Sequence, residues 1–258
     1  MRHFLTAVFL GLGLIVAMPA LAQPAMTATE EADFQLAERA YSIFARSSYA
    51  GIQPLLPNLR AALDNAPASQ PSIEIGDDYI IVRASSETQA IVLMTLASAV
   101  APDDGRERSV VTRPTTYPLI ALLLAAEAVE RGRYEEALSY TSRGLSIQPD
   151  DASLVLEHSI ALMALDRDAE ALEMIDAALA SGSVVVTDFE APLLRRRGSL
   201  LIELRRLPEA RAALERSLEI EPNHPTTLNE LAIIDASEAG DEIGDFRIIR
   251  PGEADEDR

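Results

Sequence analysis

The chain has 258 residues, with 22 basic and 41 acidic side chains and a formal net charge of −19. Nucleic acids and anionic lipid headgroups would be repelled by this charge, so it argues against both as partners. No cysteine is present, which excludes disulfides, and the fold must be held together by packing.

Residues 1–22 have the pattern of a signal peptide. A short basic start precedes the apolar run from Phe4 to Met18, and Ala20 and Ala22 give the small-x-small pattern of a cleavage site. We therefore expect cleavage after Ala22 and export to the periplasm or the outside of the cell. The alternative is an uncleaved membrane anchor, although the run is shorter than the ~20 residues of a spanning helix.

Residues 23–108 are predicted to form a small N-terminal α+β region. Apolar residues at helical spacing predict a first helix, with Thr29 as its N-cap, that continues to about Arg46. A second, shorter helix is predicted from Pro54 to Leu63, and Pro67 prevents its continuation.

A β-hairpin is predicted at about residues 72–83. Two β-branched runs flank the turn Gly76-Asp77-Asp78, and such a ribbon needs a cover on one face. The strongly apolar helix that follows Ser86 is predicted to supply that cover. A charged loop at 102–108 marks the expected domain boundary, and the form of the connector 109–117 is left open.

An internal repeat organises the second half of the chain. Ala137 and Ala171, in matching sequence contexts, are 34 residues apart, and Ala210 follows 39 residues later. Pro149 and Pro222 each come twelve residues after the alanine of their copy. Such self-similarity is typical of stacked helical hairpins.

These residues resemble the tetratricopeptide repeat (TPR) family. The resemblance implies a mainly α fold, an α-solenoid of helix-turn-helix repeats at 118–151, 152–185 and 191–224. A capping helix at 225–239 and a flexible acidic tail at 240–258 would follow. Small residues occupy the expected helix-contact positions, where they allow close approach of backbones: Ala125, Ala137, Gly144, Ser159, Ala171, Ala178, Gly198, Ala210 and Ser217.

The resemblance also implies a concave face, lined by the first helix of each hairpin, that binds a segment of a partner protein. The expected function is therefore an exported interaction adaptor with an apolar concave face. The candidate partner-binding residues are Leu122, Leu123, Ala126, Leu156, Ile160, Met163, Arg195, Arg196, Ser199 and Ile202.

Two interpretations of the apolar face remain open. In the first, the N-terminal helices with Phe34, Tyr41 and Phe44 fill it, and the protein acts as a structural or assembly module through its outer surface or oligomerisation. In the second, the face is open to a partner, as contiguous exposed apolar surface commonly is.

The run Arg195–Arg197 also has two interpretations. With Arg205 and Arg206 it forms a carboxylate-binding patch, or it is a solvated face paired with acidic neighbours. The neighbours considered are Glu190, Glu203, Glu209 and the acidic tail.

The sequence predicts no enzyme, no cofactor and no metal site. It contains no nucleophile elbow, phosphate-binding loop or dinucleotide fingerprint. Outside the predicted signal peptide the histidines are His158 and His224, which lack the paired spacing of zinc ligands. No second apolar run is long enough to span a membrane, and the oligomeric state is left open.

Overall fold

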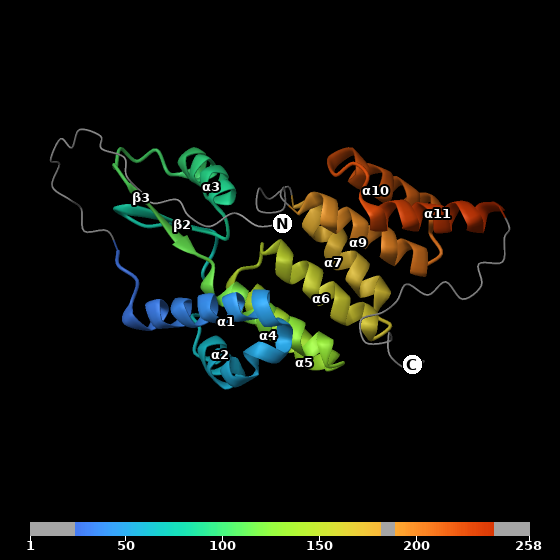
Figure 1. Ribbon diagram of the computed structural model, residues 1–258. Coiled ribbons are helices and arrows are strands. Elements are labelled where there is room, and N and C mark those ends of the chain that lie inside the picture. The colour runs from blue at the N-terminus through green and yellow to red at the C-terminus, as the bar shows by residue number, and fades with distance from the viewer. Residues whose placement is uncertain (1–23, 182–188, 240–258) are drawn as a thin grey trace.

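The computed structural model describes residues 24–181 and 189–239 (Figure 1). The predicted signal peptide, most of the connector between the second and third repeats, and the predicted acidic tail at 240–258 lie outside these ranges. The described part is mainly helical and carries one small three-stranded sheet.

The repeat region consists of consecutive antiparallel helices. They form three hairpins followed by one further helix, so the mainly α repeat fold expected from the sequence is confirmed. The helices are α4 (Thr116–Glu130), α5 (Tyr134–Ile147), α6 (Ala152–Ala164), α7 (Asp168–Ala180), α9 (Glu190–Glu203), α10 (Leu207–Ile220) and α11 (Pro225–Ala239).

The three hairpin turns have the same backbone conformation. Gly132, Asp166 and Arg205 all have positive φ, at 67°, 58° and 58°. After each of them, the next amide donates to a carbonyl near the end of the first helix, at 2.8 to 2.9 Å. Each first helix therefore ends with one residue in the left-handed conformation. This is a common C-terminal cap, and its hydrogen bond satisfies a carbonyl that the helix leaves free. The turns recur at the same spacing as the alanines, which supports the repeat assignment.

Small residues at the helix contacts explain why the hairpins are tight. Ala137, Ala171 and Ala210 are completely buried. A Cβ atom added to Gly144 would lie 2.7 Å from the Cβ of Ala121, closer than real atoms approach. Side chains of the neighbouring helices α4 and α6 therefore pack directly against the backbone of Gly144.

The N-terminal helices differ in detail from the prediction. They are α1 (Ala28–Ile52), a short 3-10 turn η1 (Gln53–Leu55) and α2 (Leu56–Asp64). The N-cap of α1 is Thr27 rather than Thr29, because the Thr27 hydroxyl accepts from the Glu30 amide and the Glu30 carboxylate accepts from the Thr27 amide. The helix also continues beyond Arg46, with a break at Ser48.

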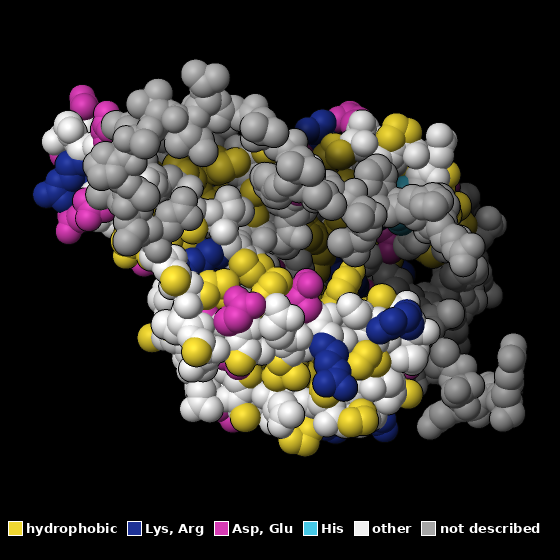
Figure 2. All heavy atoms as spheres, turned by 60° about the vertical axis from the view of Figure 1, so that its left-hand side comes forward, with side chains coloured by type: hydrophobic (Ala, Val, Ile, Leu, Met, Phe, Trp, Pro, Cys, Tyr) yellow, Lys and Arg dark blue, Asp and Glu magenta, His cyan; other side chains and the backbone are white. Residues whose placement is uncertain are grey.

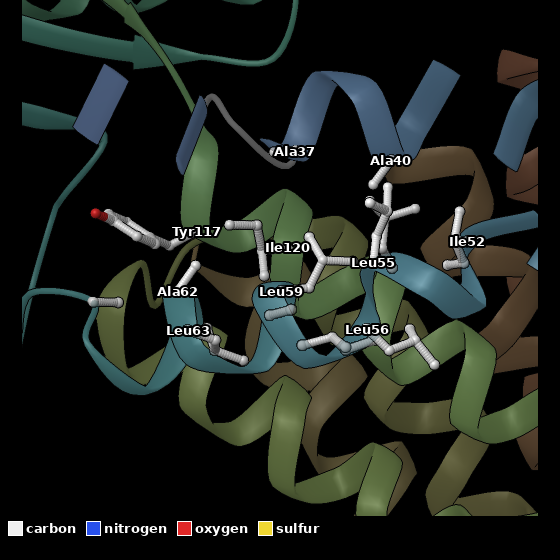
Figure 3. Close-up of a cluster of buried hydrophobic side chains, with 14 of the residues drawn as sticks. Ala37, Ala40, Ile52, Leu55, Leu56, Leu59, Ala62, Leu63, Tyr117 and Ile120 are labelled. Atoms are coloured by element: carbon white, nitrogen blue, oxygen red, sulfur yellow. The ribbon is translucent and has the colours of Figure 1, made fainter. Parts of the chain in front are cut away.

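Helices α1 and α2 pack mainly on α4, the first helix of the first repeat. Figure 3 shows side chains from all three helices converging, with Leu59 of α2 and Ile120 of α4 completely buried. Tyr117 of α4 also donates a hydrogen bond to Asp33 of α1. The N-terminal hairpin thus extends the stack at its first end. The hydrophobic core formed by α1, α2 and α4 contains residues from both sides of the boundary expected at residue 108. The division into domains stays a prediction.

Glu127 of α4 fixes this junction with three polar contacts. Its carboxylate accepts from Gln53 at 2.6 Å, from Arg131 at 2.6 Å and from Arg133 at 2.5 Å, and the residue is only 1% exposed. Burial alone would raise the pKa of Glu127, but these hydrogen bonds and the arginine charges outweigh it and lower the pKa. The ionised form is therefore the one that holds η1 against α4.

The sheet consists of β1 (Ile73–Ile75), β2 (Tyr79–Ala84) and β3 (Ser109–Pro114). The predicted hairpin is present, because β1 and β2 are antiparallel, and α3 (Glu87–Val100), capped by Ser86, covers one face. Strand β3 pairs parallel to β2 and comes from the connector whose form the sequence left open.

Candidate functional site

The first helices α4, α6 and α9 are buried on most sides and reach solvent along one stripe. On α6 the half-buried residues recur at intervals of three and four, which places them on a single helix face. The same holds on α4 and α9. We call these side chains the first-helix stripe: Leu119, Leu122, Ala126, Ser153, Leu156, Glu157, Ile160, Ala164, Pro192, Arg195, Arg196, Ile202 and Glu203.

The predicted partner-binding residues divide into two groups. Leu123, Met163 and Ser199 are buried within the protein and offer little accessible surface. Leu123 lies in the core formed with α1 and α2, and Met163 lies in the core between the second and third repeats. The other predicted residues lie on the first-helix stripe: Leu122, Ala126, Leu156, Ile160, Arg195, Arg196 and Ile202.

Charged residues occupy one equivalent position in three successive first helices. Glu157 of α6, Arg196 of α9 and Glu230 of α11 are separated by the repeat spacings of 39 and 34 residues. Leu123 is the equivalent residue of α4. We call Glu157, Arg196 and Glu230 the charged ladder. The sequence contained this signal, because aligning the first helices on the alanine repeat brings the three residues into register.

Arg196, in the middle of the ladder, has poorly satisfied hydrogen bonding. Its Nε atom is buried without a partner, and Nη1 lies 3.4 Å from the sulfur of Met163, a weak acceptor. No ion pair within 4 Å joins Arg196 to a described carboxylate. Burial lowers the pKa of Arg196, while the charges of Glu230 and Glu157 oppose that shift.

Only one carboxylate oxygen of Glu230, on α11, accepts a hydrogen bond from the described residues. The Ser199 hydroxyl donates to Oε1 at 2.5 Å, and Oε2 is buried without a partner. Burial raises the pKa of Glu230, against the hydrogen bond from Ser199 and the charges of Arg196 and Arg195. This end of the ladder is therefore closed to solvent.

Glu157 on α6 is the half-buried carboxylate of the ladder, whereas Glu230 is buried. No hydrogen bond or ion pair in the described residues involves it, and burial raises its pKa to about 6 despite the charge of Arg196. The hydroxyl of Tyr49 of α1 is close enough to be affected: its pKa is raised by burial and then by the charges of Glu157 and Glu130. The Glu157 carboxylate is thus within electrostatic range of Arg196 on α9 and of Tyr49 on α1.

The arginine run does not form one patch, because its three side chains point in different directions. Arg195 pairs with Glu221 at 2.7 Å and Arg197 pairs with Asp176 at 2.6 Å. The expected partner Glu190 pairs with Arg216 instead. Since its neighbours are neutralised, Arg196 is the member of the run that remains without a carboxylate.

Among the described residues, acidic and basic side chains are not segregated on the face of the molecule drawn in Figure 2. On the face shown in Figure 2, acidic and basic side chains of the described residues are interspersed, and no extended basic area is visible. Hydrophobic side chains appear among them.

The histidines have structural contacts. His158 Nδ1 lies 2.7 Å from the hydroxyl of Thr141, joining α6 to α5 inside the protein, and burial lowers the pKa of His158. In the described ranges, no group of three His, Asp or Glu residues is placed to hold a metal ion, and no helix is both long enough and apolar enough to cross a membrane.

A separate cavity of about 570 Å³ lies between the ends of α5 and α7 and the start of α6. Its wall is mostly apolar, and none of the ladder residues lines it. We assign the candidate site to the first-helix stripe, because the unpaired charges lie there.

Replacing Glu157 by Gln is expected to stabilise the protein. Because its pKa is raised on folding, Glu157 costs stability as the pH rises through about 6, and nothing once it is protonated. Glu157→Gln should raise the free energy of unfolding by about 1 kcal/mol at pH 8 and leave it unchanged at pH 4. Urea unfolding at both pH values measures this. Glu173→Gln, at an exposed position of α7, is the control, and a destabilised Glu157→Gln protein would refute the account.

Solved structures similar to this chain include two structures of one TPR domain and one of another protein. The first TPR of Spaghetti (RPAP3), bound to the HSP90 peptide SRMEEVD, is 26% identical, with 48% of this chain and 95% of that one covered and a TM-score of 0.44. The first TPR domain of human RPAP3 is 26% identical, with 50% and 97% covered and a TM-score of 0.45. MamA from AMB-1 is 18% identical, with 60% and 74% covered and a TM-score of 0.38.

No protein-family model matches the chain, and no curated protein matches it in sequence. The TM-scores of these three structures are all below 0.5. The assignment of the fold therefore rests on features of this chain itself: the repeat spacing, the shared turn conformation and the small residues at the helix contacts. The fold is TPR-like.

Proposed function

We propose that this protein is an exported interaction adaptor that binds a segment of a partner protein along the first-helix stripe. The observation that carries the proposal is the pair Glu157 and Arg196, two charged groups on the stripe without ion pairs. Burying charges without partners costs stability, so such groups are retained where they serve binding. No catalytic role is proposed for any residue.

Apolar side chains of the stripe would supply the rest of the contact. Leu122, Leu156 and Ile160 are half-buried and leave part of their surface to solvent. Apolar anchors beside a few placed charges are the usual composition of a peptide groove. The proposed site therefore extends from α4 across α6 to α9.

A second candidate is a structural or assembly module that acts through oligomerisation. The observation that favours it lies on α3, where Ile91 is 62% exposed and Val100 is 53% exposed. In addition, α1 and α2 already cover α4. Light scattering with size-exclusion chromatography tests this candidate, and a defined oligomer that binds no peptide would favour it over the adaptor.

The adaptor is tested by selecting random 12-residue peptides on phage against the purified chain from residue 24. The chain contains no lysine, so an amine-reactive tag attaches at the N-terminus and leaves the stripe free. We expect Ile160→Glu to weaken the selected peptides at least tenfold in fluorescence polarisation, since it places a charge where an apolar contact is made.

The control is Ala169→Glu, at an exposed position in the first turn of α7. It adds the same charge away from the stripe and should leave affinity unchanged. Peptides whose affinity ignores Ile160→Glu would contradict binding at the stripe.

A further inference from the structure

We infer that the partner segment presents a basic side chain to Glu157, with apolar residues next to it. This inference rests on the proposed function and names the chemical class of the partner. It follows from the charges around Glu157, from the apolar residues beside it and from the accessibility of its carboxylate.

The charges that face Glu157 come from several helices. Arg196 of α9 is the cation whose charge acts on it, and Glu230 of α11 acts on Arg196 from the other side. Tyr49 of α1 is neutral, because burial raises its pKa, and Glu130 of α4 lies close enough to affect Tyr49. Arg195, the second guanidinium that acts on Glu230, is neutralised by its ion pair with Glu221. With that pair set aside, three carboxylates face one guanidinium, so the site has an excess of negative charge when all are ionised.

This excess favours a cationic ligand over an anionic one. The Arg196 guanidinium already lies in the field of the Glu157 and Glu230 carboxylates, so an incoming carboxylate would meet more repulsion than attraction. Glu157, in contrast, has no donor of its own in the described residues. The chain as a whole carries a net charge of −19, which attracts a basic segment from a distance.

The neighbours of Glu157 indicate the form of the basic side chain. Leu156 and Ile160 lie beside it on the same face of α6 and are half-buried. A lysine or arginine can lay its aliphatic stem along such residues while its charged end reaches the carboxylate. Apolar residues before or after it in the partner would then contact Leu122 and the remainder of the stripe.

Binding of a cation at Glu157 is coupled to loss of a proton. Free Glu157 is about half protonated near pH 6, and a partner cation favours the ionised form. Affinity is therefore expected to rise roughly tenfold between pH 5 and pH 8, and the proton is released on binding. His158, the next residue, contributes nothing to this rise, because it is buried against Thr141 and its pKa is lowered.

The test uses the peptides selected from the phage library at pH 7.5. We expect each strong binder to contain Lys or Arg flanked by apolar residues. Replacing that basic residue by Gln should weaken binding to the wild-type chain at least tenfold. It should cost little further affinity for Glu157→Gln, because the contact is already missing there.

Glu173→Gln is the matched control, since it removes one negative charge from α7 outside the stripe. A peptide that prefers the chain only for its net charge would lose the same small amount of affinity with either variant. That result would overturn the inference, as would an affinity that falls from pH 5 to pH 8. The proposed function is judged separately: peptides that depend on Ile160 and lack a basic residue leave it standing and remove this inference alone.

Discussion

A chain that begins at residue 115 is expected to unfold or self-associate under conditions in which the chain from residue 24 stays folded. The truncation removes α1 and α2 together with the sheet and α3, and it exposes the face of α4 that carries Tyr117, Ile120 and Leu123. Each large apolar side chain contributes about 1.5–3 kcal/mol when buried. Their sum approaches the whole stability of a typical domain, ~5–15 kcal/mol.

Far-UV circular dichroism and light scattering measure this outcome. As a point-mutant comparison in the full chain, Leu59→Ala removes one side chain from the same junction and should cost about 2–5 kcal/mol. If the chain from residue 115 is instead a monomer with full helix content, the N-terminal hairpin is not part of the stack.

Glu127→Ala is expected to lower the free energy of unfolding by about 1.5–3 kcal/mol at pH 7, because it removes the buried carboxylate that accepts from Gln53, Arg131 and Arg133. Arg133 keeps its ion pair with Glu136 and both arginines reach solvent, which limits the loss. The pH dependence follows from the lowered pKa of Glu127. Its contribution is complete above the pKa of the unfolded chain and is lost as the pH falls through the folded pKa. The difference between wild type and variant should therefore shrink towards acid pH.

Denaturant unfolding at pH 7 and pH 3 checks both statements. Glu130→Ala, one turn further along α4 at an exposed position, is the control and should change stability by less than about 0.5 kcal/mol. A loss below about 1 kcal/mol for Glu127→Ala would mean that the three contacts do not hold the junction.

The repeat region was predictable because its determinants are local. Ala137, Ala171 and Ala210 recur at nearly constant spacing, and each marks a contact that only a small side chain permits. The turn at Gly132 also has a local determinant, since a left-handed residue after a helix favours glycine.

Other features depend on residues far apart in the chain. The parallel pairing of β3 with β2 joins Ser109 to Tyr79, and nothing local in either strand specifies it. The N-cap was placed two residues late, because Thr27 and Thr29 are equivalent in type and only the reciprocal bonds with Glu30 distinguish them.

The candidate binding residues came from the TPR resemblance, and their role in binding stays a prediction. The arginine run was treated as one cluster, because adjacent residues in a helix look close in sequence. Successive residues point about 100° apart, so Arg195, Arg196 and Arg197 meet different neighbours. Comparing equivalent positions between repeats, rather than neighbours within one helix, identifies Glu157 and Glu230 as the residues that accompany Arg196.

The sheet and α3 are inserted between α2 and α4, and this delays the contact that completes the first hairpin. Helices α1 and α2 leave the ribosome first, yet the surface that they bury belongs to α4, which follows only after β3. Each later repeat, in contrast, meets its neighbour almost at once. The first hairpin is thus completed by a contact of long sequence separation, which closes slowly compared with local ones. Until then the apolar side of the first hairpin remains uncovered, although this hairpin is made before any of the repeats.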